Sequence, residues 1–252
     1  MKPAGPRPLP PVSPIAMNTC RLLLCLGLAS LASAAPIVPP EDAEPLAITQ
    51  TEPAAFPPDL AAQGFTRGWA RILVAVDEQG RLVDALVIGH SHPRFAEAAA
   101  AVLPKWQFHP ARGRDGPILS VTPLNFVFRG AGQGASVTAV PAAEGGETLA
   151  PPPLPTATSL LVPFSDLDRL PTPVHLVAPA YSDEDARRHA GKKVIVQFYI
   201  DETGKVRMPT LTYADDLAVA RRALAAVAEW RFLPPKYQDR PVVTRASQTF
   251  KF

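Results

Sequence analysis

"LAAVAEWRFLPP", residues 224–235, and "AAVLPKWQFHPA", residues 100–111, share a small-residue run and a Trp-x-Phe-x-Pro ending. The two tryptophans are 124 positions apart (230 minus 106). The same shift superimposes other pairs without a gap: Asp77 on Asp201, Gly80 on Gly204, Pro117 on Pro241, and Phe128 on Phe252. Two long copies are too few for a stacked solenoid. The spacing therefore predicts one module present twice, as two separate small domains.

The composition is that of a globular chain with proline-rich connections. Of 252 residues, 47% are hydrophobic and 19% are charged, and the 31 prolines cluster outside the two copies. The formal net charge is +2 (25 minus 23), and the basic excess of the second copy is small and scattered. This charge pattern indicates a solvated surface and gives no basis for nucleic-acid binding.

An export signal is predicted at the N-terminus. Arg21 precedes the apolar run Leu22–Leu31, and a small-x-small cleavage signal ends at Ala34. We therefore expect a signal peptide over 1–35, cleaved near Ala34 or Ala35, and a periplasmic protein. The alternative is an uncleaved segment that anchors the chain in the inner membrane. The six prolines of residues 1–16 are unusual for a signal, so translation is expected to start at Met17.

Signal cleavage would remove both cysteines of the chain, Cys20 and Cys25. The mature protein would then have no disulfide, thiol nucleophile or thiolate metal ligand. The remaining chain divides by composition into four segments. They are a Pro- and acid-rich tether (36–53), a first module (54–130), a Pro/Gly/Ala-rich linker (131–172) and a second module (173–252).

The hairpin "KKVIVQFYIDETGKVRMPTLTY", residues 192–213, gives the fold of the second module. Its apolar residues alternate from Val194 to Ile200, which is the period of a half-buried strand, and a turn ends at Gly204. A helix capped by Asp215 and Asp216 and a last strand within 240–252 follow, and a short helix near 183–189 precedes the hairpin.

The first module repeats this order of elements. Strands are predicted over 70–77 and from residue 81, with helices near 59–63 and from about Pro93, and Pro104 is expected to end the long helix early. The fold class is therefore α+β, with each module a three-stranded antiparallel sheet packed against one long and one short helix. The aromatic residues that end each long helix are predicted to belong to the core: Trp106, Phe108, Trp230 and Phe232.

Three pieces of the second module occur in a family-like order: "VIVQFYIDETGKV", "AVAEWRFLPP" and "RPVVTRASQTFKF". In this order they resemble the C-terminal domain of the TonB family, and the first module resembles it more loosely. The resemblance covers about 150 of the 252 residues. It implies a non-enzymatic envelope domain that binds TonB-dependent outer-membrane transporters by pairing its sheet with a short transporter segment.

The resemblance is incomplete at two places. The family often has Tyr-Pro before the first helix, whereas this chain has Tyr181-Ser182, and we expect Tyr181 to contact a partner. TonB itself uses a Ser and a His in its membrane helix to couple to the ExbB–ExbD proton motor. The apolar segment here has Ser30 and Ser33 but no histidine, so coupling to such a motor is not expected.

Catalytic, cofactor and metal sites are not predicted. The chain has no Gly-x-Ser-x-Gly, His-Glu-x-x-His or phosphate-loop motif. The acidic pairs at 77–78 and 201–202 fall in hairpin turns, where exposed acidic residues serve turn geometry. His90 and His92 could hold a metal from one strand face, but the second module has Ala214 and Asp216 at those positions. A polar turn is the favoured interpretation of this pair.

An open strand edge is the predicted functional feature, because its unpaired backbone groups can accept an extended peptide as an added strand. The last strand of each module is the candidate. In the second module the predicted partner-binding residues are Val242, Val243, Thr244, Arg245, Ala246, Ser247 and Gln248. Of Ala246 and Ser247, one backbone N–H must face outward and the other inward. The alternative function is an envelope scaffold that binds another protein or peptidoglycan, with no role in transport.

Overall fold

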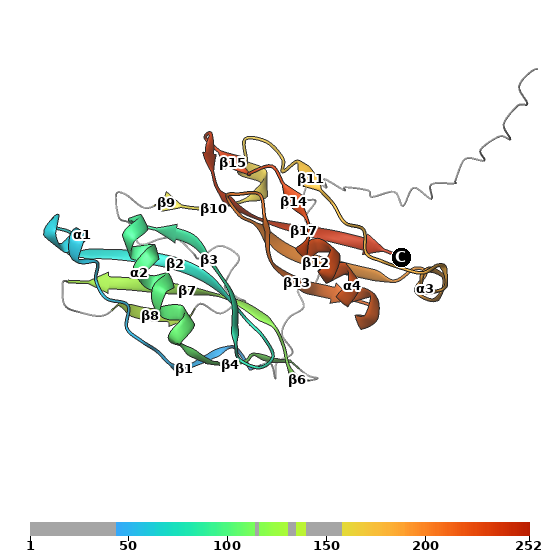
Figure 1. Ribbon diagram of the computed structural model, residues 1–252, viewed down its shortest axis with the longest axis horizontal. Helices are drawn as coiled ribbons and strands as arrows, with labels where there is room; N and C mark the ends of the chain where they lie inside the picture. Colours follow the sequence, from blue (N-terminus) through green and yellow to red (C-terminus); the bar gives the residue numbers. More distant parts are fainter. Residues whose placement is uncertain (1–43, 114–115, 131–134, 140–157) are drawn as a thin grey trace, which may run out of the picture. The chain divides into compact units, whose positions relative to one another are not determined.

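The computed structural model describes residues 44–113, 116–130, 135–139 and 158–252 (Figure 1). The predicted signal peptide, its cleavage site and the start at Met17 lie outside the described residues, as do residues 36–43 of the tether. The chain is of mixed α+β class, with short helices and several small sheets. This agrees with the predicted class. The two main sheets have five and four strands, however, where three were expected in each.

The first module contains the predicted order helix, strand, strand, helix, strand. These elements are α1 (Pro58–Ala62), β2 (Arg67–Val76), β3 (Leu82–His90), α2 (Pro93–Val102) and β7 (Ser120–Arg129). Shorter elements adjoin them: η1 (Leu103–Lys105), β4 (Gln107–His109), β5 (Arg112–Gly113) and β6 (Gly116–Pro117). Strand β1 (Ala47–Gln50), which pairs with β4, lies in the range predicted to be a tether. The sheet has the order β8-β7-β2-β3-β9, in which β8 is Ser136–Ala139 and β9 is Thr158–Ser159, and it is antiparallel throughout.

The second module has the same order of main elements. They are α3 (Asp183–Arg188), β12 (Lys193–Ile200), β13 (Val206–Ala214), α4 (Leu217–Ala228) and β17 (Val243–Lys251). Its short elements are β11 (Pro173–His175), β14 (Arg231–Phe232), β15 (Lys236–Tyr237) and β16 (Arg240–Pro241). The sheet has the order β10-β17-β12-β13, in which β10 is Leu161–Val162. Strand β10 pairs with β17 in parallel, and the other described pairs of this sheet are antiparallel.

The long helices begin and end where local chemistry places them. Asp216 caps α4 by accepting bonds from the N–H groups of Ala218 and Val219, while His92 Nδ1 accepts from Arg94 N at the start of α2. Pro104 follows the end of α2 inside the 3-10 turn η1, so the predicted early end of this helix is confirmed. Each helix covers one face of its sheet (Figure 1).

The tryptophans after these helices close the two cores. Trp230 and Trp106 are 1% and 6% exposed, and Phe232 and Phe108 are each 8% exposed. Each indole also donates to a backbone carbonyl in the segment that precedes the first helix of its module. Trp230 Nε1 bonds to Val177 O at 2.8 Å, and Trp106 Nε1 bonds to Glu52 O at 3.0 Å. The polar end of each ring is thus satisfied while its apolar body is buried.

The hairpin turn is tied to the segment after the helix. Gly204 has φ of 84°, and its carbonyl accepts a bond from Phe232 N at 2.8 Å. A Cβ at this position would overlap the carbonyl oxygen of Phe232, and a Cβ at Gly80 would overlap that of Phe108. Glycine is therefore required both for its backbone angle and for the close approach. This contact explains why the Asp-x-x-Gly turn and the Trp-x-Phe ending recur together.

The expected linker, 131–172, contributes strands to both sheets. They are β8 (Ser136–Ala139), β9 (Thr158–Ser159) and β10 (Leu161–Val162), and the 3-10 turn η3 (Phe164–Asp166) follows them. Leu160 lies between β9 and β10. Its N–H donates to Ile88 O at 3.0 Å, and its carbonyl accepts from Val243 N at 2.7 Å. The segment Thr158–Val162, here called the strap, is therefore hydrogen-bonded to a strand of each module.

Side chains of both modules also contact one another. One apolar cluster contains Leu73, Ala75, Leu86 and Ile88 of the first module with Tyr199, Met208 and Val243 of the second. Beside it, Arg207 forms a two-point ion pair with Asp84, with Nε 2.9 Å from Oδ2, and also donates to Ala85 O. Independent folding of the two modules stays a prediction.

Candidate functional site

The direction of each backbone group on β17 follows from two hydrogen bonds at its ends. Phe252 N donates to Lys192 O, toward β12, whereas Val243 N donates to Leu160 O, on the opposite side. Alternate residues of a strand face opposite neighbours. Even-numbered residues of β17 therefore face β12, and odd-numbered residues face outward. Ala246 is paired with Phe198 in this ladder, and the N–H of Ser247 points away from it.

The strap covers the first part of this outward side. Leu161 and Val162 pair with Val243 and Thr244 in parallel, and the Thr244 hydroxyl donates to Val162 O at 2.9 Å. Val242 N is already bonded to Pro235 O. Three of the predicted binding residues, Val242 to Thr244, therefore lie beside the chain's own backbone. Of the remaining four, Arg245 and Ser247 face outward and Ala246 and Gln248 face β12.

The open part of the edge begins after Arg245. Among the described strands, none pairs with β17 on the outward side of Ser247, Thr249 and Lys251. The Gln248 side chain donates to Thr249 O at 2.8 Å, so this outward carbonyl is bonded by a side chain and not by a strand. Thr249 and Lys251 lie beyond the seven predicted binding residues, within the last strand predicted over 240–252.

The open edge is regular and polar. Its pairing with β12 runs without a register shift from Lys193↔Lys251 to Ile200↔Thr244. The side chains of its outward-facing residues Ser247, Thr249 and Lys251 are exposed. Arg245, just before the open part, is exposed as well, so a cationic side chain lies at each end. Charged side chains protect an edge from unspecific pairing while its backbone groups stay accessible.

The opposite edge of the sheet, β13, is less suited to accept a strand. Its pairing with β12 contains two register shifts, and Met208 has φ of 49° immediately before Pro209. Bulges and prolines are features that interrupt edge pairing. A continuous ladder is therefore expected on β17 and not on β13.

Tyr181, the predicted partner contact, packs at the end of the core. Its ring centroid lies 4.8 Å from that of Phe252, and the Arg222 guanidinium lies 5.5 Å from its ring. The residue is half-buried, packs against the core of the second module, and lies in the segment between β11 and α3. It therefore lies beside the residue that follows β17, and a role in partner contact stays a proposal.

The acidic residues of the hairpin turns serve the turns themselves. Asp201 Oδ1 accepts bonds from the backbone N–H groups of Thr203 and Lys205, both at 3.0 Å, and Asp77 Oδ1 accepts from Gln79 and Arg81. The aspartates are buried, at 5% and 8% exposure, rather than exposed as expected. Burial raises the pKa of Asp201, but the bonds from Thr203 and Lys205 outweigh it and the pKa lies below its usual range.

The histidine pair lies at the start of the long helix of the first module. His92 Nδ1 is used to cap α2, and burial, followed by the charge of His92, lowers the pKa of His90. Within the described residues, no group of three or more His, Cys, Asp or Glu side chains could hold a metal ion. The favoured interpretation, a polar turn before the helix, is consistent with the use of His92 as a cap.

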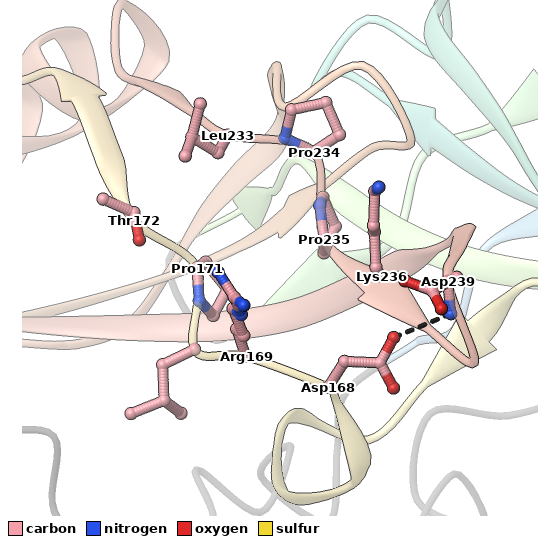
Figure 2. Close-up of a pocket in the computed structure, with 10 residues that line it drawn as sticks. Asp168, Arg169, Pro171, Thr172, Leu233, Pro234, Pro235, Lys236 and Asp239 are labelled. Atoms are coloured by element: carbon pink, nitrogen blue, oxygen red, sulfur yellow. Dashed lines mark hydrogen bonds between the residues drawn. The ribbon is translucent and has the colours of Figure 1, made fainter.

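A pocket of about 460 Å³ lies between the segment 168–172 and the segment 233–239 (Figure 2). Figure 2 shows prolines and Leu233 on its walls and Asp168 bonded to the backbone of Asp239. Asp168 accepts from Asp239 N at 2.8 Å and from Gln238 N at 2.9 Å, and these bonds lower its pKa. This carboxylate stabilises the turn between β15 and β16. The pocket lining has no histidine, serine or cysteine to pair with it.

The last strand of the first module is not an open edge. β8 pairs antiparallel with Leu124–Val127 of β7. The prediction of a candidate edge in each copy is therefore wrong for these residues of the first module. The linker supplied the covering strand, which is only four residues long and lies in a Gly- and Ala-rich sequence, so its periodicity is too short to have revealed it.

Comparison with known proteins gives one family match. Residues 177–252 match the family model "Gram-negative bacterial TonB protein C-terminal". A solution NMR structure of Pseudomonas aeruginosa TonB CTD is 25% identical, with coverage of 35% of this chain and 86% of that chain and a TM-score of 0.28. A search of curated proteins found no match. The predicted resemblance is thus confirmed for the second module, and for residues 54–130 it stays a prediction.

The helices of the described residues have at most 12 residues. None of them is long and apolar enough to cross a membrane.

Proposed function

We propose that the second module binds an extended segment of a TonB-dependent outer-membrane transporter by adding it as a strand to β17. The observation that carries this proposal is the regular open edge that begins after Arg245, on a module that matches the TonB C-terminal family. Domains of this family are non-enzymatic and contact outer-membrane transporters. The chain would therefore act in the cell envelope, in support of transport.

The contact is made mainly by the main chain. The outward N–H and C=O groups of Ser247, Thr249 and Lys251 would form the ladder with the incoming segment. The incoming strand would replace the bond from the Gln248 side chain to Thr249 O. Arg245 and Lys251 would add a preference for acidic groups at the two ends of the segment, because both side chains are exposed.

Two neighbouring proline variants test this geometry. Ser247→Pro removes an outward N–H, so it should abolish binding while the thermal melt stays close to that of the parent. Ala246→Pro removes an N–H that faces Phe198, so it should lower the melting temperature instead. The first module contains a natural precedent, since Pro123 occupies the position equivalent to Ser247 within the continuous strand β7.

The measurement is an NMR titration of the full chain with peptides that copy N-terminal plug segments of outer-membrane transporters. Shifts should cluster on residues 245–252. Shifts that cluster on α4 would overturn strand addition to β17. If no transporter segment produced shifts, the scaffold function would be favoured, and envelope extracts would then be the source in which to seek its partner.

A further inference from the structure

The two last strands differ in a way that bears on how many partners the chain can bind. Leu124–Val127 of β7, covered by β8, are equivalent by the 124-residue shift to 248–251, which lie on the open edge of β17. On β7, Gly130 N donates to Thr66 O, on the side of β2. Odd-numbered residues of β7 therefore face outward, as they do on β17. The equivalent edge of the first module thus already has a strand beside it.

Strand β8 is held on this edge by main-chain and side-chain bonds. Asn125 pairs with Thr138 and Val127 pairs with Ser136, and both β7 residues face outward, so these are the hydrogen-bonded pairs of the ladder. The Ser136 hydroxyl donates to Val127 O at 3.3 Å. One residue earlier, Ala135 N donates to Ala54 O at 2.9 Å. The segment is therefore anchored at its start and paired along its length.

A proline blocks the next outward position. Pro123 pairs in register with Leu73 of β2, and its nitrogen is on the outward side, where a strand would need a donor. Its equivalent on β17 is Ser247, whose N–H is available. The first module therefore has two obstacles to strand addition, the bound segment β8 and Pro123, at positions where the second module has neither.

We propose that β8 is a built-in occupant of the strand-addition edge of the first module, so that the chain binds one extended partner and binds it on the second module. The statement about partner number rests on the proposed function of β17. The statement that β8 occupies and closes the edge of β7 does not, and it can be tested in the absence of any partner.

Amide hydrogen exchange of the free full chain tests the occupancy. The amides of Asn125 and Val127 should exchange more slowly than those of Thr249 and Lys251, by about tenfold or more after correction for intrinsic rates. Equal rates for the two pairs would overturn the proposal, because β8 would then not protect the edge.

Two proline variants of β8 test whether its hydrogen bonds to β7 are what protect the amides of β7. Thr138 faces β7, so Thr138→Pro should raise exchange at Asn125 and Val127 toward the rates of Thr249 and Lys251. Val137 has its N–H on the side away from β7, and Val137→Pro is the matched control that should leave both amides protected. Unchanged protection in Thr138→Pro would contradict the assigned pairing.

Partner number is measured by titration with a transporter-derived peptide. One peptide per chain is expected, with no shifts over 120–129, and Ser247→Pro should remove all binding. Two peptides per chain, or binding that persists in Ser247→Pro with shifts on β7, would overturn the proposal. Failure of every peptide to bind would count against the proposed function of β17, while the exchange measurements would still decide the role of β8.

Discussion

Replacement of Gly204 by alanine tests how the hairpin turn is joined to the segment after the long helix. The variant must hold an alanine at φ of 84°, which costs roughly 1–2 kcal/mol. Its Cβ would also overlap the carbonyl oxygen of Phe232, so the turn or the segment must move. That movement breaks the bond from Phe232 N to Gly204 O, worth about 1 kcal/mol, and adds about 1–3 kcal/mol of overpacking.

Gly191→Ala is the matched control for backbone strain. Gly191 has φ of 80°, nearly that of Gly204, but a Cβ there has no atom within 4 Å. Both variants should lose roughly 1–2 kcal/mol through the backbone angle. Only Gly204→Ala should lose a further ~2–4 kcal/mol through the contact with Phe232.

The assay is urea unfolding of the full chain, monitored by tryptophan fluorescence. Trp230 can report on this contact because its ring centroid lies 6.3 Å from that of Phe232. The free energy of unfolding of each variant is compared with that of the parent at constant slope. Equal losses for the two variants would refute the account, since the close approach to Phe232 would then carry no energy beyond the backbone angle.

Three further predictions concern the core, the pH dependence and export. Trp230→Ala should lower the free energy of unfolding by about 3–5 kcal/mol in a chemical denaturation, and a neutral result would show that the ring does not close the core. A hydrogen bond from Arg222 lowers the pKa of Asp185 to about 2, so the ionised carboxylate stabilises the fold above its unfolded pKa of about 3.9 and this contribution disappears as the pH falls through about 2. Asp185→Asn should therefore be less stable than the parent at pH 6 and equal to it below pH ~2 in parallel thermal melts, and a constant difference across this range would contradict the assigned ion pair. Finally, N-terminal sequencing of the protein from the periplasm should begin at Ala35 or Pro36, whereas a cytoplasmic protein that keeps its first residue would rule out export.

The sequence was sufficient to predict the elements whose signals are local. The alternation from Val194 to Ile200, the capping aspartate Asp216 and the helix-ending Pro104 each act within a few residues, and the structure has these elements close to the predicted positions. The repeat of Trp-x-Phe also indicated a buried position for Trp230. Such signals are set by propensity and periodicity, which a single chain displays directly.

Strands β8, β9 and β10 could not be predicted because their pairing is decided by distant partners. Each is two to four residues long, too short for a periodic signal, and lies in a Pro-, Gly- and Ala-rich range. What makes them strands is an available edge on another element. For the same reason, the choice between Ala246 and Ser247 as the outward residue needed the register with β12, which no local pattern contains.

Pro123 and β8 also limit how copies of this chain could associate through their strand edges. A molecule in which both last strands were open would have two exposed strand edges, and repeated edge-to-edge pairing of molecules could extend them into a fibre. Because β8 covers β7 and Pro123 removes a donor from it, only one of the two last strands, β17, has an open edge. Pairing between the β17 edges of two molecules would then stop at a dimer. The chain can therefore keep one strand edge open without polymerising through its last strands.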